Sequence, residues 1–339
     1  MTSLGLCIVG CGRFAAFHAR AARRLGRTVA VSFASRDQGR AEIYRRRFGG
    51  VAAFGSYDAA AADARVQALV FCTPHDLHLD NVRLAAMHRK AALLEKPIAR
   101  TLPEADRLIE TAREASVTLM IGENFHFMPA FTAARRSLAA GAIGAVRQVL
   151  LTPRGYWLPG GWRRRRAQVG GGMLIDGGIH YVHLLREWGG PIAEVSAAAP
   201  PNLFSELEGE DTAFVLVRFR SGAVGVLANS IAAPRLPRFQ WAWATGTEGS
   251  LAVDNRGRYL RLHSGDGTRR SVFLRDRRGL RAQLAEFVAA VREGRPPGLS
   301  PQSARDDLAV VLAAYRAIDT GRTVSLEERA VQTSTADEL

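Results

Sequence analysis

Short apolar runs alternate with helical patterns along the first third of the chain. Residues 4–10 are almost entirely apolar, and residues 14–25 then place apolar side chains at the spacing of one helix face. Further buried strands are expected at 29–34, at 68–72, in the run that ends at Leu94, and at 118–122, with helices at 38–48, 79–88 and 102–115 and in the Ala-rich segment after Tyr57. Strands that alternate with helices are typical of a parallel sheet with helices on both faces.

Strand-like segments dominate the chain after residue 144. They are expected at 145–153, 193–199, 211–219, 222–231, 239–245, 249–254, 258–263 and 270–275. Gly-containing turns separate several of them, which predicts one large, mainly antiparallel sheet. A helix is expected before these strands, at 129–140, and two follow them, at 279–293 and 302–319, while the polar stretch after about Glu327 is expected to fray.

The length and the two patterns together predict two domains. A chain of 339 residues is long for a single core. We therefore expect an N-terminal α/β domain over residues 1–123 and a C-terminal α+β domain with a large, mainly antiparallel open sheet over residues 124–339. The composition, with 47% hydrophobic and 23% charged residues, is ordinary for a soluble globular protein.

Several features indicate a protein of the cytoplasm that binds no membrane. No apolar run approaches the roughly 18 residues of a membrane span, and the N-terminus begins directly with a strand pattern rather than a signal peptide. The three cysteines (Cys7, Cys11 and Cys72) lie in or beside apolar runs. They are typical of small buried side chains in a reducing compartment and are too few for a disulfide framework.

The charge raises the question of nucleic acid. The formal net charge is +14 and the pI is near 10.9. The arginines are scattered through nearly every segment, however, and no helix-turn-helix, zinc-finger or RNA-binding aromatic motif accompanies them. We expect no nucleic-acid partner, and we interpret the excess as a general preference for Arg combined with an anionic ligand.

Lys96 is the first catalytic candidate. Of the 46 basic residues only Lys90 and Lys96 are lysine, and lysine is kept where arginine does not serve, as in proton transfer, because guanidinium does not deprotonate in proteins. The side chain follows a buried strand, and Pro97 then stops the ladder and fixes the backbone. Such a turn at the carboxyl edge of a sheet is where open α/β sheets bind ligands. The alternative is a surface lysine that caps the strand.

A glycine-rich turn follows the first strand. Gly10, Gly12 and Ala15 form a GxGxxA fingerprint between that strand and the next helix, which is the context that binds a dinucleotide. Gly10 permits the tight turn, and Gly12 lets backbone amides approach a pyrophosphate. The second strand ends at Ser35-Arg36 rather than at an acidic residue, and a hydroxyl with a guanidinium suits a 2′-phosphate. NADP is therefore favoured over NAD, unless Asp37 takes the ribose role and Arg36 is a solvated loop residue.

The other strands of the first domain also end in polar clusters. Thr73-Pro74 leads to His75 and His78, Glu95 precedes Lys96, and Glu123-Asn124 follows the last strand. The carboxyl ends of parallel strands share one edge of a sheet, so a single ligand-binding crevice explains all of these clusters.

A second group of candidates lies after Gly170-Gly171-Gly172. Asp176 and His180 are four residues apart, so on a regular helix they share one face, where the carboxylate orients the imidazole as a proton carrier. With His183 they make an Asp-x3-His-x2-His pattern that resembles a metal site, but no Cys or further clustered acid completes it, so no metal is expected. The other alternative is that these histidines only pack or cap the helix.

The order of these motifs resembles the Gfo/Idh/MocA family, the group of glucose-fructose oxidoreductase and inositol dehydrogenase. The resemblance spans essentially the whole chain and implies a Rossmann domain followed by a C-terminal domain whose open sheet forms homodimers or homotetramers. It implies that Lys96 lies beside the nicotinamide and the reacting hydroxyl, that His180 is the general acid/base, and that Asp176 supports it. It also implies a cis peptide bond before Pro97.

The resemblance further implies which residues contact the ligands. The cofactor is expected to contact Gly10, Gly12, Arg13, Phe14, Ser35, Arg36, Thr73, Pro74, His78, Glu95 and Asn124, together with Arg163 from the run 163–166. The substrate pocket is expected to comprise Lys96, His126, Tyr156, Asp176, His180 and His183. Many relatives have Asp where His183 stands, so the departure bears on substrate preference. The arginine run suits an anionic sugar or polyol, since Arg binds carboxylate or phosphate bidentately.

Three functions are compatible with these residues. The first is an NAD(P)-dependent oxidoreductase that moves a hydride between nicotinamide and a secondary alcohol or ketone of a sugar, inositol or related polyol. The second is a hydrolase or lyase that keeps its dinucleotide and acts by transient oxidation. The third is a dinucleotide-sensing regulator without turnover, which the presence of Lys96, Asp176 and His180 disfavours because a sensor needs no proton relay.

Overall fold

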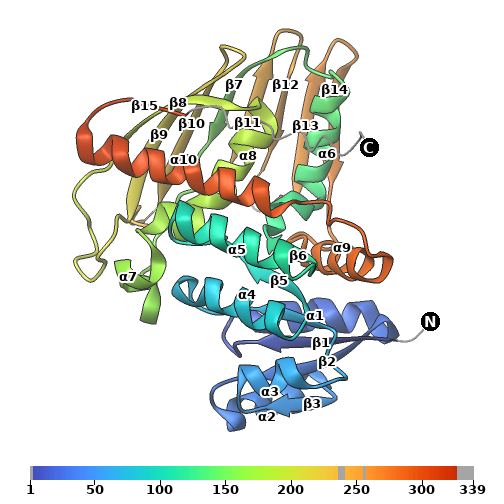
Figure 1. The fold of residues 1–339 in the computed structure, drawn as a ribbon. Coiled ribbons are helices and arrows are strands. Elements are labelled where there is room, and N and C mark those ends of the chain that lie inside the picture. Colours follow the sequence, from blue (N-terminus) through green and yellow to red (C-terminus); the bar gives the residue numbers. More distant parts are fainter. Residues whose placement is uncertain (1–2, 236–240, 255–256, 327–339) are drawn as a thin grey trace, which may run out of the picture.

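The computed structural model describes residues 3–235, 241–254 and 257–326 (Figure 1). The stretch after 326, for which fraying is expected, lies outside the described residues, as do the first positions of the strand expected at 239–245. Two sheets organise the rest of the chain, one of six strands and one of nine.

The first sheet is entirely parallel, as the alternating pattern predicts. Its strand order is β3-β2-β1-β4-β5-β6. The strands are β1 (Leu4–Val9), β2 (Val29–Ala34), β3 (Ala52–Phe54), β4 (Ala68–Phe71), β5 (Ala91–Glu95) and β6 (Leu119–Gly122). The central strands are apolar throughout because helices bury them from both sides. The edge strand β3 has only three residues, all half-buried, and so short a run has no pattern from which a strand could be predicted.

The helices of this half follow the expected positions closely. They are α1 (Ala15–Leu25), α2 (Gln38–Phe48), α3 (Tyr57–Ala62), α4 (His78–Met87) and α5 (Leu102–Glu114). Side-chain caps define three of their starts, at Asp37, Ser56 and Thr101, each of which accepts a hydrogen bond from a backbone N–H of the first turn. The first domain is therefore a Rossmann fold.

The second sheet is mainly antiparallel, which confirms the prediction. Its order is β14-β13-β12-β11-β7-β10-β9-β8-β15, and the one parallel pair among these neighbours is β7 with β10. The strands are β7 (Val146–Leu151), β8 (Ile192–Ala198), β9 (Thr212–Phe219), β10 (Val224–Ser230), β11 (Ala242–Gly246), β12 (Ser250–Val253), β13 (Tyr259–Ser264), β14 (Gly267–Val272) and β15 (Val324–Ser325).

The remaining helices follow β6 along the chain. They are α6 (Pro129–Ala139), α7 (Arg166–Val169), α8 (Ile179–Gly189), α9 (Leu280–Glu293) and α10 (Pro301–Thr320). Helix α9 returns to the first domain, where Leu284 and Phe287 are buried in the same core as Ala15 and Ala19 of α1. A domain division at residue 123 stays a prediction, and the helix α9 shows that the later part of the chain also covers the first sheet.

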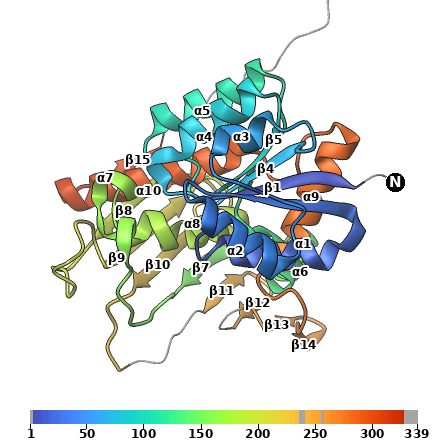
Figure 2. The same cartoon turned by 90° about the horizontal axis from the view of Figure 1, so that it is seen from below.

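Helices cover one face of the second sheet, and no described element covers the other, which we call the open face. Helices α6, α8 and α10 lie on the same side of this sheet in both views (Figures 1 and 2). Strand β9 alternates buried and exposed residues, and Phe214 and Leu216 are 51% and 50% exposed on the open side. The pairing places Leu216 beside Val226 and Val226 beside Leu150, so these side chains form an apolar row across three strands.

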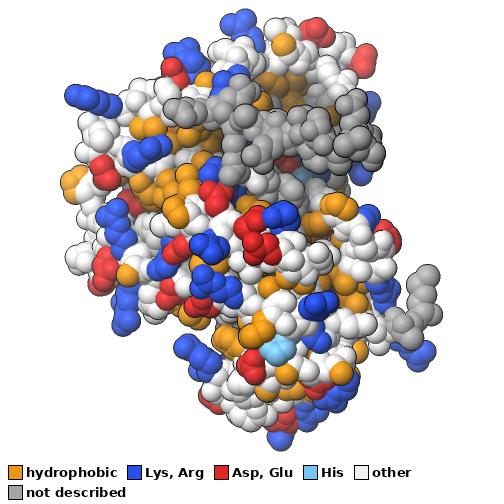
Figure 3. Space-filling view, viewed as in Figure 1, with side chains coloured by type: hydrophobic (Ala, Val, Ile, Leu, Met, Phe, Trp, Pro, Cys, Tyr) orange, Lys and Arg blue, Asp and Glu red, His pale blue; other side chains and the backbone are white. Residues whose placement is uncertain are grey.

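Two findings bear on the partners of the protein. Lys and Arg side chains are spread over the face seen in Figure 3 and do not gather in one patch. Among the described residues, no helix has both the length and the apolar character needed to cross a lipid bilayer.

Candidate active site

The expected clusters meet at one edge of the first sheet. The sheet order places β1, β4, β5 and β6 side by side, so the segments that follow them share the carboxyl edge. The strand order reverses between β1 and β4, which makes this edge a topological switch point. The polar clusters that the sequence places after separate strands therefore border one crevice.

The turn after β1 fits the pyrophosphate of a dinucleotide. Gly10 has a φ of +89°, and a Cβ there would lie 2.8 Å from the Cys72 carbonyl oxygen, so only glycine suits the position. A Cβ on Gly12 would meet no atom within 4 Å, so this backbone borders open space. Helix α1 then begins without a side-chain cap and without an acidic residue in its first turn. Its first N–H groups remain available to an anion.

Lys96 lies in the turn after β5, where the Lys96-Pro97 peptide bond is cis, which confirms the expectation. Its ammonium donates to the backbone carbonyl of Asp176 and lies 3.7 Å from Asp176 Oδ1. Arg163 Nε donates to Asp176 Oδ2 at 3.1 Å. Burial by itself raises the pKa of Asp176, but the positive charges of Lys96 and Arg163 outweigh it and hold this pKa at about 2. The carboxylate therefore stays ionised and fixes two cations.

A tightly held turn positions Asp176. Residues Leu174–Gly178 form a π-helical turn directly before α8, a geometry that is frequent at functional sites. The hydroxyl of Tyr315 accepts hydrogen bonds from the amides of Gly172 and Ile175, and Glu210 accepts from the amide of Leu174 at 2.6 Å. A Cβ on Gly172 would collide with the Glu210 backbone. The glycines at 171 and 172 therefore leave the space that Tyr315 and Glu210 need to reach this turn.

His180 is oriented by Glu123, and this corrects the expectation that Asp176 does so. His180 Nδ1 donates to Glu123 Oε1 and Oε2 at 2.6 and 2.8 Å. Burial raises the pKa of Glu123, yet the imidazole of His180 outweighs this effect and leaves that pKa below its usual value. The π-helical turn changes the spacing on which the Asp176–His180 pairing depended. Asp176 still interacts with His180 electrostatically, but its carboxylate oxygens contact Lys96 and Arg163.

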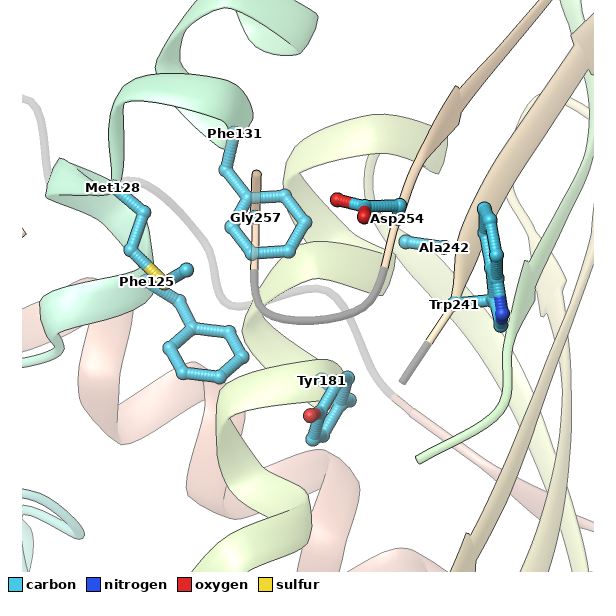
Figure 4. Close-up of a pocket in the computed structure, with 8 residues that line it drawn as sticks. All are labelled: Phe125, Met128, Phe131, Tyr181, Trp241, Ala242, Asp254 and Gly257. Atoms are coloured by element: carbon cyan, nitrogen blue, oxygen red, sulfur yellow. The ribbon is translucent and has the colours of Figure 1, made fainter. Parts of the chain in front are cut away.

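An aromatic wall fixes the ring of His180. Phe125 stacks on it with ring centroids 4.4 Å apart and an interplanar angle of 8°. Phe125 belongs to the 3-10 turn η3 (Asn124–Phe127) and packs in turn on Phe131 of α6 and Tyr181 of α8. Figure 4 shows the small pocket that these side chains border, with Trp241 and Asp254 on its other side. The general-base candidate is thus held by one hydrogen-bond partner and one stacking partner.

Two histidines of the Thr73-Pro74 segment are deeply buried. His75 Nδ1 contacts the Val169 carbonyl at 2.9 Å, and its Nε2 lies 3.6 Å from Asp176 Oδ1. Burial lowers the pKa of His75 far below its usual value, so the ring is neutral. His78 is fully buried, and its Nδ1 contacts the Pro97 carbonyl at 2.9 Å. In this structure His78 therefore supports the Lys96 turn instead of lining the crevice.

Glu95 also has a partner that the sequence did not reveal. His18 Nε2 of α1 lies 2.6 Å from Glu95 Oε1, and both side chains are nearly inaccessible. A histidine on the inner face of a helix is commonly a core residue, so sequence alone gave no signal for this pair. The pair ties the helix of the glycine turn to the strand of Lys96.

Other candidates are held in place without meeting Lys96. Asn124 donates to the Arg278 carbonyl at 2.7 Å, and Thr73 accepts from Asn81 at 2.6 Å. Tyr156 is 55% exposed and packs on Phe204. The side chains of His126 and His183 contact each other and Glu187, and His183 also contacts Asp307. Roles in cofactor or substrate binding stay predictions for all of these residues, as for Arg13, Phe14 and Pro74.

This arrangement suits hydride-transfer chemistry at a dinucleotide. A cation next to the carboxyl edge of a Rossmann sheet can stabilise charge that develops on an oxygen, and an imidazole backed by a carboxylate can take a proton. Fold and site together define the class as an NAD(P)-dependent oxidoreductase that acts on CH–OH groups.

Comparison with known proteins agrees. Residues 4–123 match the family model described as an oxidoreductase family with an NAD-binding Rossmann fold, and residues 131–252 match that of the GFO/IDH/MocA C-terminal domain. The chain belongs to the GFO/IDH/MocA oxidoreductase family, which confirms the resemblance. It is 28% identical to myo-inositol 2-dehydrogenase from Thermotoga maritima, over 95% of this chain and 98% of that protein.

Two further relatives support the family assignment. D-Apiose dehydrogenase from Paraburkholderia graminis is also 28% identical, over 94% of this chain and 89% of that protein. The crystal structure of an oxidoreductase domain protein from Kribbella flavida superimposes with a TM-score of 0.90 at 25% identity, covering 97% of this chain and 100% of that one. The match therefore extends over both sheets.

Proposed function

We propose that the protein is an NADP-preferring dehydrogenase that oxidises a secondary alcohol of a sugar or polyol. The observation that carries the proposal is the pair of supported side chains at the carboxyl edge of the first sheet. Lys96 is held by Asp176, and His180 is held by Glu123. The relatives named for myo-inositol and D-apiose support a polyhydroxylated substrate.

Each side chain has a distinct task in this proposal. The dinucleotide, held by the glycine turn and the start of α1, supplies the hydride acceptor. His180 takes the proton of the substrate hydroxyl, and the Glu123 carboxylate stabilises the resulting imidazolium. The ammonium of Lys96 stabilises negative charge on the same oxygen as the hydride leaves its carbon. Asp176 holds the Lys96 side chain and directs it to that point.

The function is tested by supplying the nucleotide-stripped protein with NADP⁺ and a panel of inositols, pentoses and hexoses. The proposal expects absorbance of reduced nicotinamide to rise with at least one polyol. A panel that includes sugar acids and sugar phosphates also tests the anionic substrate, which stays a prediction. Two arginines of the run 163–166 already have partners within the protein. Arg163 donates to Asp176 and stacks on Trp162, and Arg164 donates to the Pro159 carbonyl.

The preference for NADP is proposed from the end of β2. Arg36 is exposed there, and it lies close enough to Tyr57 for its positive charge to act on that side chain. The side chain of Asp37, the alternative ribose ligand, is the N-cap of α2 and accepts from the Arg40 amide at 3.1 Å. A carboxylate engaged in capping is less suited to bind the ribose hydroxyls. Arg36 is the better placed of the two residues, and its charge suits a 2′-phosphate.

Replacing Arg36 by Ala is expected to weaken NADP⁺ binding by roughly 10–100-fold, which is the usual worth of a charge-assisted contact to phosphate. NAD⁺ binding should change little because NAD⁺ has no 2′-phosphate. Titration of the stripped protein measures both affinities. Arg113→Ala removes an exposed arginine of α5 that pairs with Glu110 and serves as the control for lost charge. Equal or tighter NAD⁺ binding by the unaltered protein would contradict the proposal and move Asp37 into the ribose role.

We also propose that the open face of the second sheet joins identical subunits into a dimer or tetramer. The apolar row through Leu216, Val226 and Leu150 is uncovered within the described chain, and such a row on a monomer marks an interaction surface. Leu216→Asp is expected to shift the protein to a monomer in light scattering. Ile43→Asp, on an exposed side chain of α2, should leave the mass unchanged. A monomeric unaltered protein would refute the assignment.

A further inference from the structure

Three side chains converge beside the pair of Glu123 and His180. They are His126 of η3 and His183 and Glu187 of α8, and one donor atom from each lies within 4.8 Å of the other two. His183 and Glu187 are separated by one helical turn, so they face the same way. We propose that this cluster is a binding site for a divalent transition metal of the zinc type.

The distances between the donor atoms suit such an ion. His183 Nε2 lies 3.3 Å from His126 Nδ1 and 3.2 Å from Glu187 Oε1. Tetrahedral zinc with ligands at about 2.0–2.1 Å places its donors roughly 3.3 Å apart. The third separation, between His126 Nδ1 and Glu187 Oε1, is 2.5 Å and has to widen by less than about 1 Å to match that geometry. Two imidazoles and one carboxylate favour zinc over magnesium or calcium.

In the absence of a metal, hydrogen bonds hold the cluster together around the Glu187 carboxylate. His126 Nδ1 lies 2.5 Å from Glu187 Oε1, 3.2 Å from Arg135 Nη1 and 3.3 Å from His183 Nε2. Glu187 thus accepts from both rings and from Arg135. A ring nitrogen carries either one proton or one lone pair. Once both ring nitrogens present lone pairs, these and the carboxylate converge on one point, where a cation can bind all three.

The surroundings of His183 resemble those of a metal ligand. Its Nδ1 donates to Asp307 Oδ2 at 2.9 Å, which leaves Nε2 directed at the cluster. Arg186 holds Asp307 in turn at 2.6 Å, and both His183 and Asp307 are almost fully buried. A carboxylate that fixes the far nitrogen of a histidine is the usual support behind a metal-binding imidazole.

Two groups around Glu187 have to yield when the metal binds. Arg135 Nη1 donates to both oxygens of Glu187 at 3.0 and 3.2 Å, but its side chain is 29% exposed and can turn to solvent. His183 Nε2 lies 3.2 Å from Glu187 Oε1 and has to present its lone pair to the metal, because a metal binds the unprotonated nitrogen of an imidazole.

The site would brace the catalytic pair. The segment that carries His126 also carries Phe125 and follows Glu123 directly, and the helix that carries His183 and Glu187 also carries His180. A metal would clamp these two elements together next to the Glu123–His180 contact. The sequence pattern groups His183 with Asp176 and His180, and on that grouping no metal is expected. The partners instead come from another segment and from the next helical turn.

Zinc titration of the chelator-treated, full-length protein tests the proposal. We expect one zinc ion per chain by calorimetry and by metal analysis after dialysis. Glu187→Gln and His126→Gln should remove this binding, and Asp307→Asn should weaken it roughly 10–100-fold, as for other supporting carboxylates. His88→Gln is the control, because His88 lies outside the cluster and pairs with Asp58.

Arg135→Gln keeps all three ligands and removes the competing guanidinium, so it should bind zinc more tightly than the unaltered protein. This variant keeps the proposal testable if a ligand variant fails to fold, which circular dichroism reports. The proposed zinc site would be refuted if the unaltered protein did not bind one zinc ion per chain. It would also be refuted if a folded Glu187→Gln variant bound zinc with unchanged affinity. Both results leave the proposed dehydrogenase function untouched, because that function is tested by nicotinamide reduction.

Discussion

Replacing Lys96 by Met is expected to lower kcat for alcohol oxidation by about 10²–10³-fold, which is the usual cost of losing one preorganised group that stabilises an oxyanion. The ammonium of Lys96 is fixed by the carbonyl and carboxylate of Asp176. The methionine side chain has similar length but no charge. Steady-state kinetics with saturating NADP⁺ and substrate measure the effect.

The second lysine provides a matched control for this variant. Lys90 donates to the carbonyls of Asp63 and Val66, away from the carboxyl edge of the sheet. Lys90→Met should therefore reduce stability without a large change in kcat. Lys96→Arg should also be poorly active, because a planar guanidinium neither fits the ammonium position nor transfers a proton. Unchanged kcat in Lys96→Met would show that another group stabilises the developing charge.

Replacing Glu123 by Gln is expected to lower kcat by about 10²–10⁴-fold, because a carboxylate that orients and stabilises an imidazolium contributes on this scale. Glutamine keeps the size of the side chain but cannot neutralise the charged ring. Steady-state kinetics with saturating NADP⁺ and substrate measure the effect.

A role of Glu123 at His180 has to be separated from a purely structural one. Glu123 also accepts a hydrogen bond from the Phe125 amide, so its replacement removes a contact within η3. Thermal unfolding followed by circular dichroism measures that loss. Reduced kcat in a variant that unfolds at the temperature of the unaltered protein assigns the effect to His180. Asp176→Asn is the comparison, because its oxygens contact Lys96 and Arg163 instead.

The sequence was sufficient for most of the fold because burial leaves a periodic signature. Strands β1 and β4 of the first sheet are apolar throughout, and β9 alternates between its faces, so both sheets are visible in the pattern. The edge strands β3 and β15 are too short for such a pattern. Helix α9 returns to pack on α1, which lies far from it in the sequence. The pattern of one amphipathic helix does not reveal which other helix it packs against.

For the site, the sequence located the candidate residues better than their partners. Motifs at strand ends place Lys96 and Glu123 near one edge, because parallel strands share that edge. The pairing of His180 with Glu123 depends on the π-helical turn, which spacing in a regular helix cannot reveal. The buried pair of His18 and Glu95 joins distant segments and carries no local signal.

The most direct test of the account follows the hydride itself. The nucleotide-stripped protein is given NADP⁺ and the best polyol of the panel, deuterated at the reacting carbinol carbon, and both products are examined by NMR. The account predicts deuterium at C4 of the reduced nicotinamide in an amount equal to the ketone formed. A product that regains the deuterium, or that forms without net nicotinamide reduction, would contradict it and indicate transient oxidation by a retained cofactor.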